Sequence, residues 1–232
     1  MRAEHLRIIP WMILFFPAMA FLESAVVVYL RALYYPDGFD FPLVTMDERL
    51  VLTEVVREVA TMIMLLAPGA MVTRYAIERF AWFCFGFGIW DLFYYIWLKM
   101  LLDWPSDPGT MDLLFLIPIP WVGPVWAPCL VSIGLIALAL IILYKRGTAG
   151  WRIDRIEWSL LILAASIIIL SFILDPIDQG IGSDAFSTDA AVKITTYVPG
   201  KFAIGVFLVG CATAASTMIR MFVRKGSPRR DG

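Results

Sequence analysis

The stretch TEVVREVATMIMLLAPGAMVT, residues 53–73, joins a charged half to an apolar half within one predicted helix. Glu54, Arg57, Glu58 and Thr61 recur at helical spacing, so they share one face of that helix. Ionisable groups are costly in the hydrocarbon core of a membrane and normally face a protein interior or a wet cavity. The stretch therefore predicts a membrane helix whose polar face is turned toward other helices.

The composition of the whole chain agrees with a membrane location. Of its 232 residues, 60% are hydrophobic and 17% are charged, whereas soluble domains average about 45–50% and about 25%. This predicts a polytopic membrane protein with the lipid bilayer as its main partner. A net charge of -1 and dispersed basic residues argue against a nucleic-acid partner.

Outside the opening stretch, further apolar runs are long enough to cross a bilayer, which takes about 20 residues. The predicted fold is all-α: a polytopic membrane helical bundle with six transmembrane helices in a single transmembrane domain, followed by a short basic tail at 224–232. The helices are expected at about 8–32, 47–73, 80–102, 122–144, 158–174 and 201–223. The first run resembles a secretory signal around Ala18–Ala20, but it continues to Leu30 and is therefore expected to be a retained helix.

Two shorter segments do not fit this pattern of spans. Residues 111–120 are too few to cross and contain prolines, so we expect a short interfacial or re-entrant segment there. Pro124 and Pro128 are then expected to bend the first half of the fourth helix. A short amphipathic helix is expected at about 189–195, within the long polar segment that precedes the last span.

The distribution of basic residues predicts the orientation. With six spans, 13 of the 19 Lys and Arg residues fall on the side that holds both termini. The positive-inside rule then places both termini in the cytoplasm of a multi-pass protein of the cell (inner) membrane. The opposite loops are acidic and include Asp103 and Asp112, which we interpret as solvated loop residues. Arg31, near the end of its helix, is interpreted as an interfacial, snorkelling group.

Depth within the membrane groups the buried charges. At about 1.5 Å per residue, Glu23, Glu58 and Asp91 lie at similar levels of a core about 30 Å thick. If the first three helices pack together, the charged and tyrosine side chains of their outer halves converge on one cavity that opens outward. The candidate ion- or substrate-binding residues are Glu23, Glu54, Arg57, Glu58, Asp91, Tyr94, Tyr95 and Lys99.

Three classes of function fit this cluster. The first is cation- or proton-linked transport of a small ion or small-molecule substrate. The second is a membrane-embedded enzyme whose carboxylates hold a metal. The third is a scaffold or accessory subunit of a membrane complex, or a homo-oligomer, in which the same charges only join helices.

Histidine and cysteine narrow the chemistry further. His5 is the only histidine and lies near the N-terminus, while the three cysteines are far apart in apolar runs. This argues against histidine-rich zinc sites, haem with two histidine ligands and a Ser-His-Asp triad within the membrane. The sequence indicates no particular cofactor, and we favour transport among the three classes.

Overall fold

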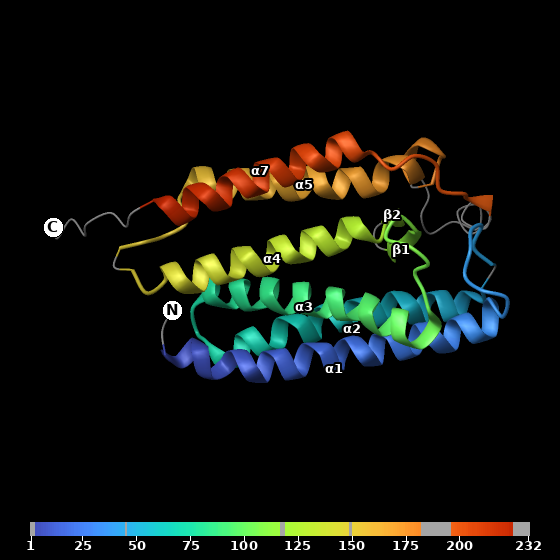
Figure 1. Ribbon diagram of the computed structural model, residues 1–232, viewed down its shortest axis with the longest axis horizontal. Coiled ribbons are helices and arrows are strands. Elements are labelled where there is room, and N and C mark those ends of the chain that lie inside the picture. Colours follow the sequence, from blue (N-terminus) through green and yellow to red (C-terminus); the bar gives the residue numbers. More distant parts are fainter. Residues whose placement is uncertain (1–2, 45, 117–118, 149, 182–195, 225–232) are drawn as a thin grey trace.

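The computed structural model describes residues 3–44, 46–116, 119–148, 150–181 and 196–224. Within these residues it contains six long helices and a two-stranded hairpin (Figure 1). They are α1 (Ala3–Tyr34), α2 (Glu48–Val72), α3 (Ala76–Leu102), β1 (Met111–Phe115), β2 (Trp121–Pro124), α4 (Trp126–Lys145), α5 (Arg155–Asp178) and α7 (Ile204–Val223). We call the end at which α1 begins and α7 ends the terminal end, and the opposite end, which carries β1 and β2, the hairpin end (Figure 1).

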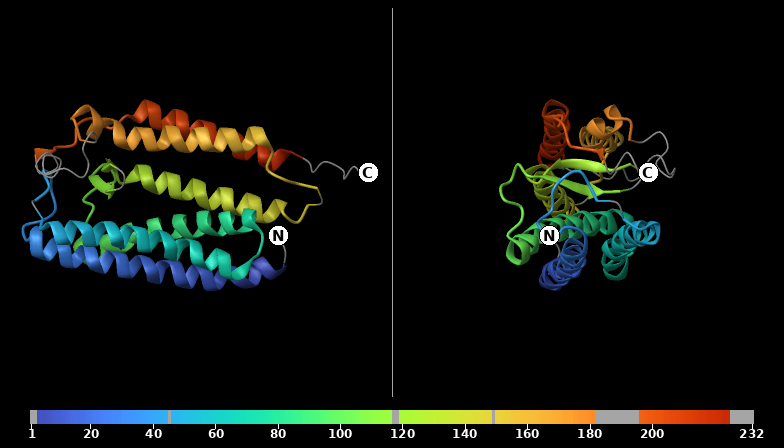
Figure 2. Two further views of the ribbon diagram at one scale, coloured as in Figure 1. Left: turned by 180° about the vertical axis from the view of Figure 1, so that it is seen from behind. Right: turned by 90° about the vertical axis from the view of Figure 1, so that its right-hand side faces the viewer.

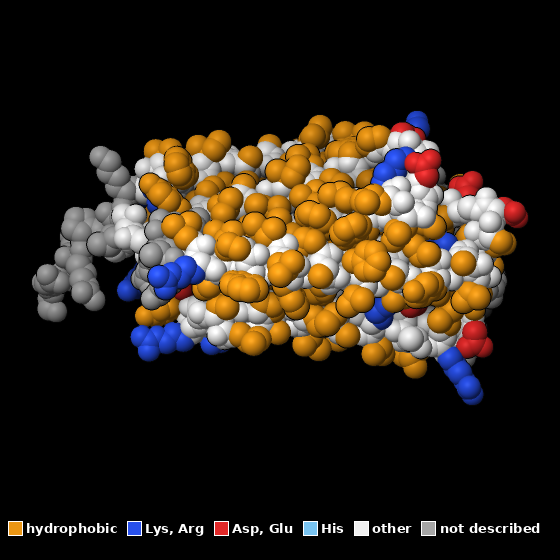
Figure 3. All heavy atoms as spheres, turned by 60° about the horizontal axis from the view of Figure 1, so that its bottom comes forward, with side chains coloured by type: hydrophobic (Ala, Val, Ile, Leu, Met, Phe, Trp, Pro, Cys, Tyr) orange, Lys and Arg blue, Asp and Glu red, His pale blue; other side chains and the backbone are white. Residues whose placement is uncertain are grey.

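Five of these helices, α1, α3, α4, α5 and α7, are long and apolar enough to cross a membrane. Apolar side chains cover the middle of the molecule in Figure 3, and charged side chains gather toward its two ends. The protein is therefore a multi-pass membrane protein with a helical bundle. The sixth long helix, α2, has Glu48, Arg49, Glu54, Arg57 and Glu58 in its first half, which lower its hydropathy.

The helices form two groups, and the contact between α4 and α7 connects them (Figure 2). In the first group α3 packs against α1, α2 and α4, and in the second α5 packs against α7. A Cβ on Gly86 of α3 would overlap the buried ring of Phe16 of α1, so glycine is what allows these two helices to approach. Such close contacts matter in a membrane, where lipid is as apolar as the side chains and packing supplies the attraction between helices.

Local signals in the sequence fix several helix ends. Asp154 and Glu157 form a capping box at the start of α5, in which each side chain accepts the other residue's backbone N–H. Glu157 is fully buried and also binds Arg224, at 2.8 Å, which ties α5 to α7. At the end of α3, Asp103 adopts a left-handed conformation that stops the helix.

The connection between α3 and α4 differs from the expectation. Residues 111–124 contain an antiparallel hairpin in which Met111 pairs with Pro124 and Asp112 with Gly123. The prediction that the fourth helix begins at about Val122 is therefore wrong: α4 begins at Trp126, because the preceding residues are hydrogen-bonded to β1. Pro124 ends a strand and does not bend the helix.

The hairpin also joins the two helix groups. A Cβ on Gly123 would lie 2.7 Å from the ring of Phe172 of α5, and Trp121 stacks on that same ring. β2 thus contacts α5, while Asp112 and Phe115 of β1 contact Tyr95 and Phe87 of α3. The expected short helix at 189–195 and all of the expected tail after residue 224 lie outside the described residues.

Candidate functional site

The candidate residues lie in the hairpin-end half of the first helix group, where they form several separate contacts. The first contact joins α1 to α2. Arg57 of α2 binds Glu23 of α1, and its Nη2 lies 2.7 Å from Oε2 of Glu54. Thr61, one helical turn further along α2, donates a 3.0 Å hydrogen bond to Glu23. One guanidinium is therefore shared by two carboxylates on two helices, and its removal would leave both carboxylates without a cation.

Glu58 forms the second contact, with the hairpin. Its two carboxylate oxygens accept hydrogen bonds from the backbone N–H of Leu116 at 3.0 and 3.2 Å. Leu116 directly follows β1, so this bond connects α2 to the hairpin. The helix face that sequence spacing assigns to Glu54, Arg57 and Glu58 thus reaches two different neighbours.

Asp91 forms the third contact and is the most isolated acid of the set. It is 7% exposed and accepts a 2.7 Å hydrogen bond from the hydroxyl of Ser132 in α4, itself fully buried. Among the described residues, no Lys or Arg forms an ion pair with Asp91. Gly88, one turn earlier, allows this approach, since a Cβ there would lie 2.5 Å from the backbone oxygen of Ser132.

Asp112 and Arg31 are two further buried charged residues, which sequence reasoning missed. Asp112 is 3% exposed and accepts a 3.0 Å hydrogen bond from the hydroxyl of Tyr95. Arg31 is 8% exposed and lies over the rings of Trp104 and Phe39, at 3.9 and 4.4 Å from their centroids. The interpretations of Asp112 as a solvated loop residue and of Arg31 as a snorkelling group are therefore wrong.

Burial controls the ionisation of Asp112, which lies in β1, outside the spanning helices. Loss of hydration raises the pKa of Asp112 to about 6, and the charge of Arg31 and the hydrogen bond from Tyr95 lower it in part. Arg31 and Asp112 thus interact electrostatically at the hairpin end of the bundle.

Tyr94 packs beside Tyr95 on α3, with their ring centroids 5.1 Å apart, and its backbone connects α3 to α1. The neighbouring Ser24 of α1 donates a 3.2 Å hydrogen bond to the backbone oxygen of Tyr94. The polar residues form a network through the first helix group, although they do not converge on one point.

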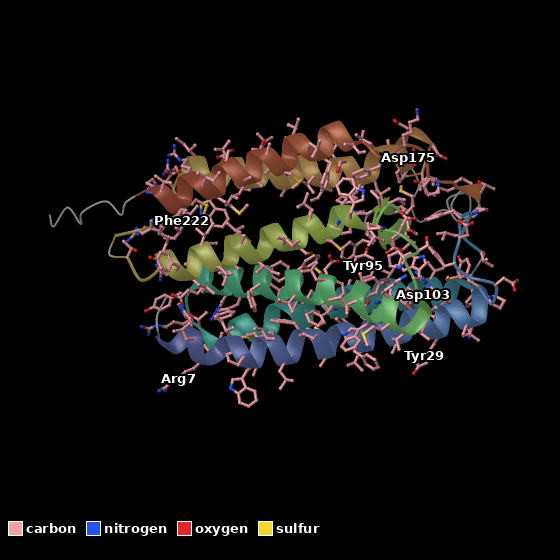
Figure 4. The ribbon with its side chains drawn as sticks, viewed as in Figure 1. Arg7, Tyr29, Tyr95, Asp103, Asp175 and Phe222 are labelled. Carbon is pink, nitrogen blue, oxygen red and sulfur yellow. The ribbon has the colours of Figure 1, made fainter. Side chains whose placement is uncertain are left out.

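Lys99 does not belong to this network, so its predicted place in the cluster is wrong. Its side chain is 49% exposed and binds the carboxylate of Asp103 at 2.7 Å and the backbone oxygen of Pro105 at 3.0 Å. The hydrogen bond from Lys99 lowers the pKa of Asp103. Figure 4 labels Asp103 and Tyr95 near the hairpin end. The ammonium of Lys99 therefore binds groups at the C-terminal end of α3.

Two hollows of the structure lie away from the cluster. One hollow, of about 240 Å³, lies outside the hairpin between Phe39, Thr110 and Val198. The other, of about 450 Å³, lies at the terminal end around His5 and Trp82. In the described parts of the chain, no group of three or more His, Cys, Asp or Glu side chains is placed to hold a metal.

A weak signal existed for the missed residues. The short apolar runs on both sides of residues 116–120 are the length of strands, and a pair of strands with one buried face turns alternate side chains inward. Asp112 would then be one candidate for burial. Ser132, the partner of Asp91, carries no such signal, because the sequence around a serine in an apolar helix does not identify its hydrogen-bond partner.

Comparison of the chain with protein-family models, with curated proteins and with solved structures finds no match. The functional argument therefore rests on the residues and their geometry.

Proposed function

We propose that this protein carries out proton-linked transport across a membrane, with Asp91 as the group that takes up and releases the proton. The observation that supports this most is the setting of Asp91: a buried carboxyl inside an apolar helix, hydrogen-bonded to the neutral hydroxyl of Ser132. Ionisable residues in spanning helices commonly mark ion pathways and proton relays. A carboxyl without a fixed cation can change its protonation state without leaving a partner charge unpaired.

The geometry favours a proton over a metal ion at this position. Hard cations such as Ca²⁺ take six to eight oxygen ligands, and among the described residues no three acids are grouped to hold a metal, since Glu23, Glu58 and Asp91 have different partners. A proton needs only one carboxylate oxygen. For this reason transport ranks above the membrane-embedded enzyme with a carboxylate metal site.

A route from Asp91 to the hairpin end runs through neighbouring polar groups. One turn along α3 from Asp91, the hydroxyl of Tyr95 donates a 3.0 Å hydrogen bond to Asp112, and the proposed route follows these groups. The positive charge of Arg31 favours the deprotonated form of Asp112 at this end. In this proposal Glu23, Arg57 and Glu54 hold α1 and α2 together, and Asp91 takes up and releases the proton.

The proposed orientation places the terminal end in the cytoplasm of the cell membrane, with six spans that include α2. Most Lys and Arg residues fall on the side of the termini, which is the pattern that the positive-inside rule describes. The hairpin and the acidic loops then face outward.

A second candidate function is that of a subunit in a membrane complex. It is favoured by the pairing of Glu23 and Glu54 with Arg57 and by the bond from Leu116 to Glu58, which give four of the polar candidates structural partners. In that case Asp91 and Ser132 would serve only to fix α3 against α4.

Flux measurements separate the two candidates. The purified protein is reconstituted into liposomes that contain a pH-sensitive dye, and gradients of H⁺, Na⁺ and K⁺ are imposed in turn. We expect a proton flux above that of empty liposomes, and its change on addition of small solutes would name a coupled substrate. Flux equal to that of empty liposomes under every gradient would favour the subunit over the transporter.

A further inference from the structure

The hollow at the terminal end is built from three helices. It has a volume of about 450 Å³, within the range of small-ligand pockets, about 300–1,000 Å³. α1 contributes His5, Arg7 and Ile8, the end of α2 and the following turn contribute 72–75, and α3 contributes Glu78 and Trp82. It therefore lies at the opposite end of the bundle from the hairpin, far from the polar network.

The charge that remains uncompensated around this hollow is positive. Glu78 is buried and accepts hydrogen bonds from Thr73 at 2.8 Å and from Arg146 at 3.3 Å. Arg7 and Arg74 are exposed and, within the described residues, form no ion pair. Figure 4 places Arg7 at this end of α1, and Figure 3 shows Lys and Arg side chains gathered there.

Two buried ring nitrogens in the wall have no hydrogen-bond partner among the described residues: Nδ1 of His5 and Nε1 of Trp82. His5 is 4% exposed and Trp82 is fully buried. An indole N–H can only donate, and a buried donor left unpaired destabilises the protein. Nε2 of His5 lies 3.7 Å from Oε2 of Glu78, and the tautomer of His5 that carries its proton on Nδ1 can donate from that atom.

A hollow with two exposed guanidinium groups that form no ion pair among the described residues, and two unpaired ring nitrogens in its wall, fits an oxyanion. Arg74 also donates a 3.3 Å hydrogen bond to the hydroxyl of Tyr75, which leaves its other N–H groups for a ligand. We propose that it binds a phosphate-bearing anion, with Arg7 and Arg74 holding the charge and His5 and Trp82 donating to the phosphate oxygens. Guanidinium groups match phosphate oxygens in pairs. The same chemistry is offered by the headgroup of an acidic phospholipid and by free phosphate.

The test uses the full-length protein in a neutral detergent. Native mass spectrometry measures binding of phosphatidylglycerol against zwitterionic phosphatidylcholine, and thermal unfolding measures the effect of inorganic phosphate against chloride at equal ionic strength. The variant is Arg7→Gln with Arg74→Gln. The matched control is Arg155→Gln, an exposed arginine at the start of α5 and outside the hollow.

A preference for phosphatidylglycerol that falls by about tenfold or more in the double variant and not in the control identifies a lipid headgroup site; tenfold corresponds to about 1.4 kcal/mol. Stabilisation by inorganic phosphate that only the double variant loses identifies a site for free phosphate. Equal losses in the control, or binding unchanged in the double variant, would overturn the proposal. Arg7→Lys with Arg74→Lys keeps both charges and is expected to retain part of the binding, which guards against a folding defect in the first variant.

Discussion

Asp91 of α3 and Ser132 of α4 share a 2.7 Å hydrogen bond in the buried part of the bundle. The bond depends on how closely the two helices approach, and Gly88 sets that approach one turn away. In a helical membrane protein a small residue at such a crossing lets polar side chains on facing helices meet. The position of the proposed proton carrier is therefore determined by backbone packing as much as by its own side chain.

The first prediction concerns this crossing. In Gly88→Ala the new methyl group would lie 2.5 Å from the backbone oxygen of Ser132 and 2.7 Å from Ile136. We expect overpacking to cost about 1–3 kcal/mol, seen as a lower midpoint of thermal unfolding in detergent. Gly134→Ala in α4 is the matched control, because a Cβ there meets no atom within 4 Å. It is expected to be neutral or stabilising, and equal midpoints for the two variants would contradict the account.

The second prediction concerns the ion pairs between α1 and α2. Arg57→Met leaves Glu23 and Glu54 without their shared cation. Removal of one partner from a buried pair typically costs about 3–5 kcal/mol, and the lower part of that range is expected because Arg57 is 24% exposed. Arg49→Gln, an exposed change on the same helix, should leave the unfolding midpoint unaltered. If Arg57→Met were as stable as Arg49→Gln, these pairs would not hold the helices.

The third prediction concerns the hairpin. Tyr95→Phe removes the phenol that donates to Asp112, so that buried carboxyl loses one hydrogen bond. The expected cost is about 1–3 kcal/mol, together with faster amide exchange at 111–116, measured by hydrogen–deuterium exchange. Tyr29→Phe is the control, since that ring is 66% exposed on α1. Identical amide exchange at 111–116 in both variants would show that Tyr95 does not stabilise the hairpin.

The fourth prediction concerns pH at the terminal end. The hydrogen bond from the backbone N–H of Glu157 lowers the pKa of Asp154 below its ordinary value of 3.8, and Arg220 lowers it further. The folded state therefore binds this proton less readily than the unfolded state, so the stabilisation is present above pH 3.8 and is lost as the pH falls through the lowered value.

Asp154→Asn keeps an N-cap acceptor but removes the charge. The wild type is expected to be more stable than Asp154→Asn at neutral pH, with a difference that shrinks as the pH falls below about 4. Thermal unfolding of both proteins across this range measures it. A difference that does not change with pH would show that the charge of Asp154 has no part in joining α5 to α7.

The spans could be predicted from the sequence because each long apolar run has only one way to satisfy its backbone in lipid, which is a helix. The hairpin could not, because a run as short as Met111–Phe115 fits a strand, an interfacial segment or the start of a helix equally well. Its strand pairing is decided by Trp121–Pro124 folding back on it, a contact that no local pattern reports.

The candidate site was predictable as a set of residues and less so as an arrangement. Helical spacing placed Glu54, Arg57 and Glu58 on one face, but it did not indicate that Glu58 turns to Leu116 while Arg57 turns to Glu23. Lys99 shares the face of Asp91 in a regular helix, yet its long side chain reaches the exposed end of α3. Partners between helices depend on packing, which a single sequence does not specify.

The most direct test of the central claim is proton flux into dye-loaded liposomes that contain wild-type protein or Asp91→Asn. Asparagine keeps the shape of Asp91 and can still accept the hydrogen bond from Ser132, so both proteins are expected to elute as the same folded species. The account predicts a clear flux for the wild type, and for Asp91→Asn a flux no higher than that of empty liposomes. Equal flux in the two proteins would contradict it.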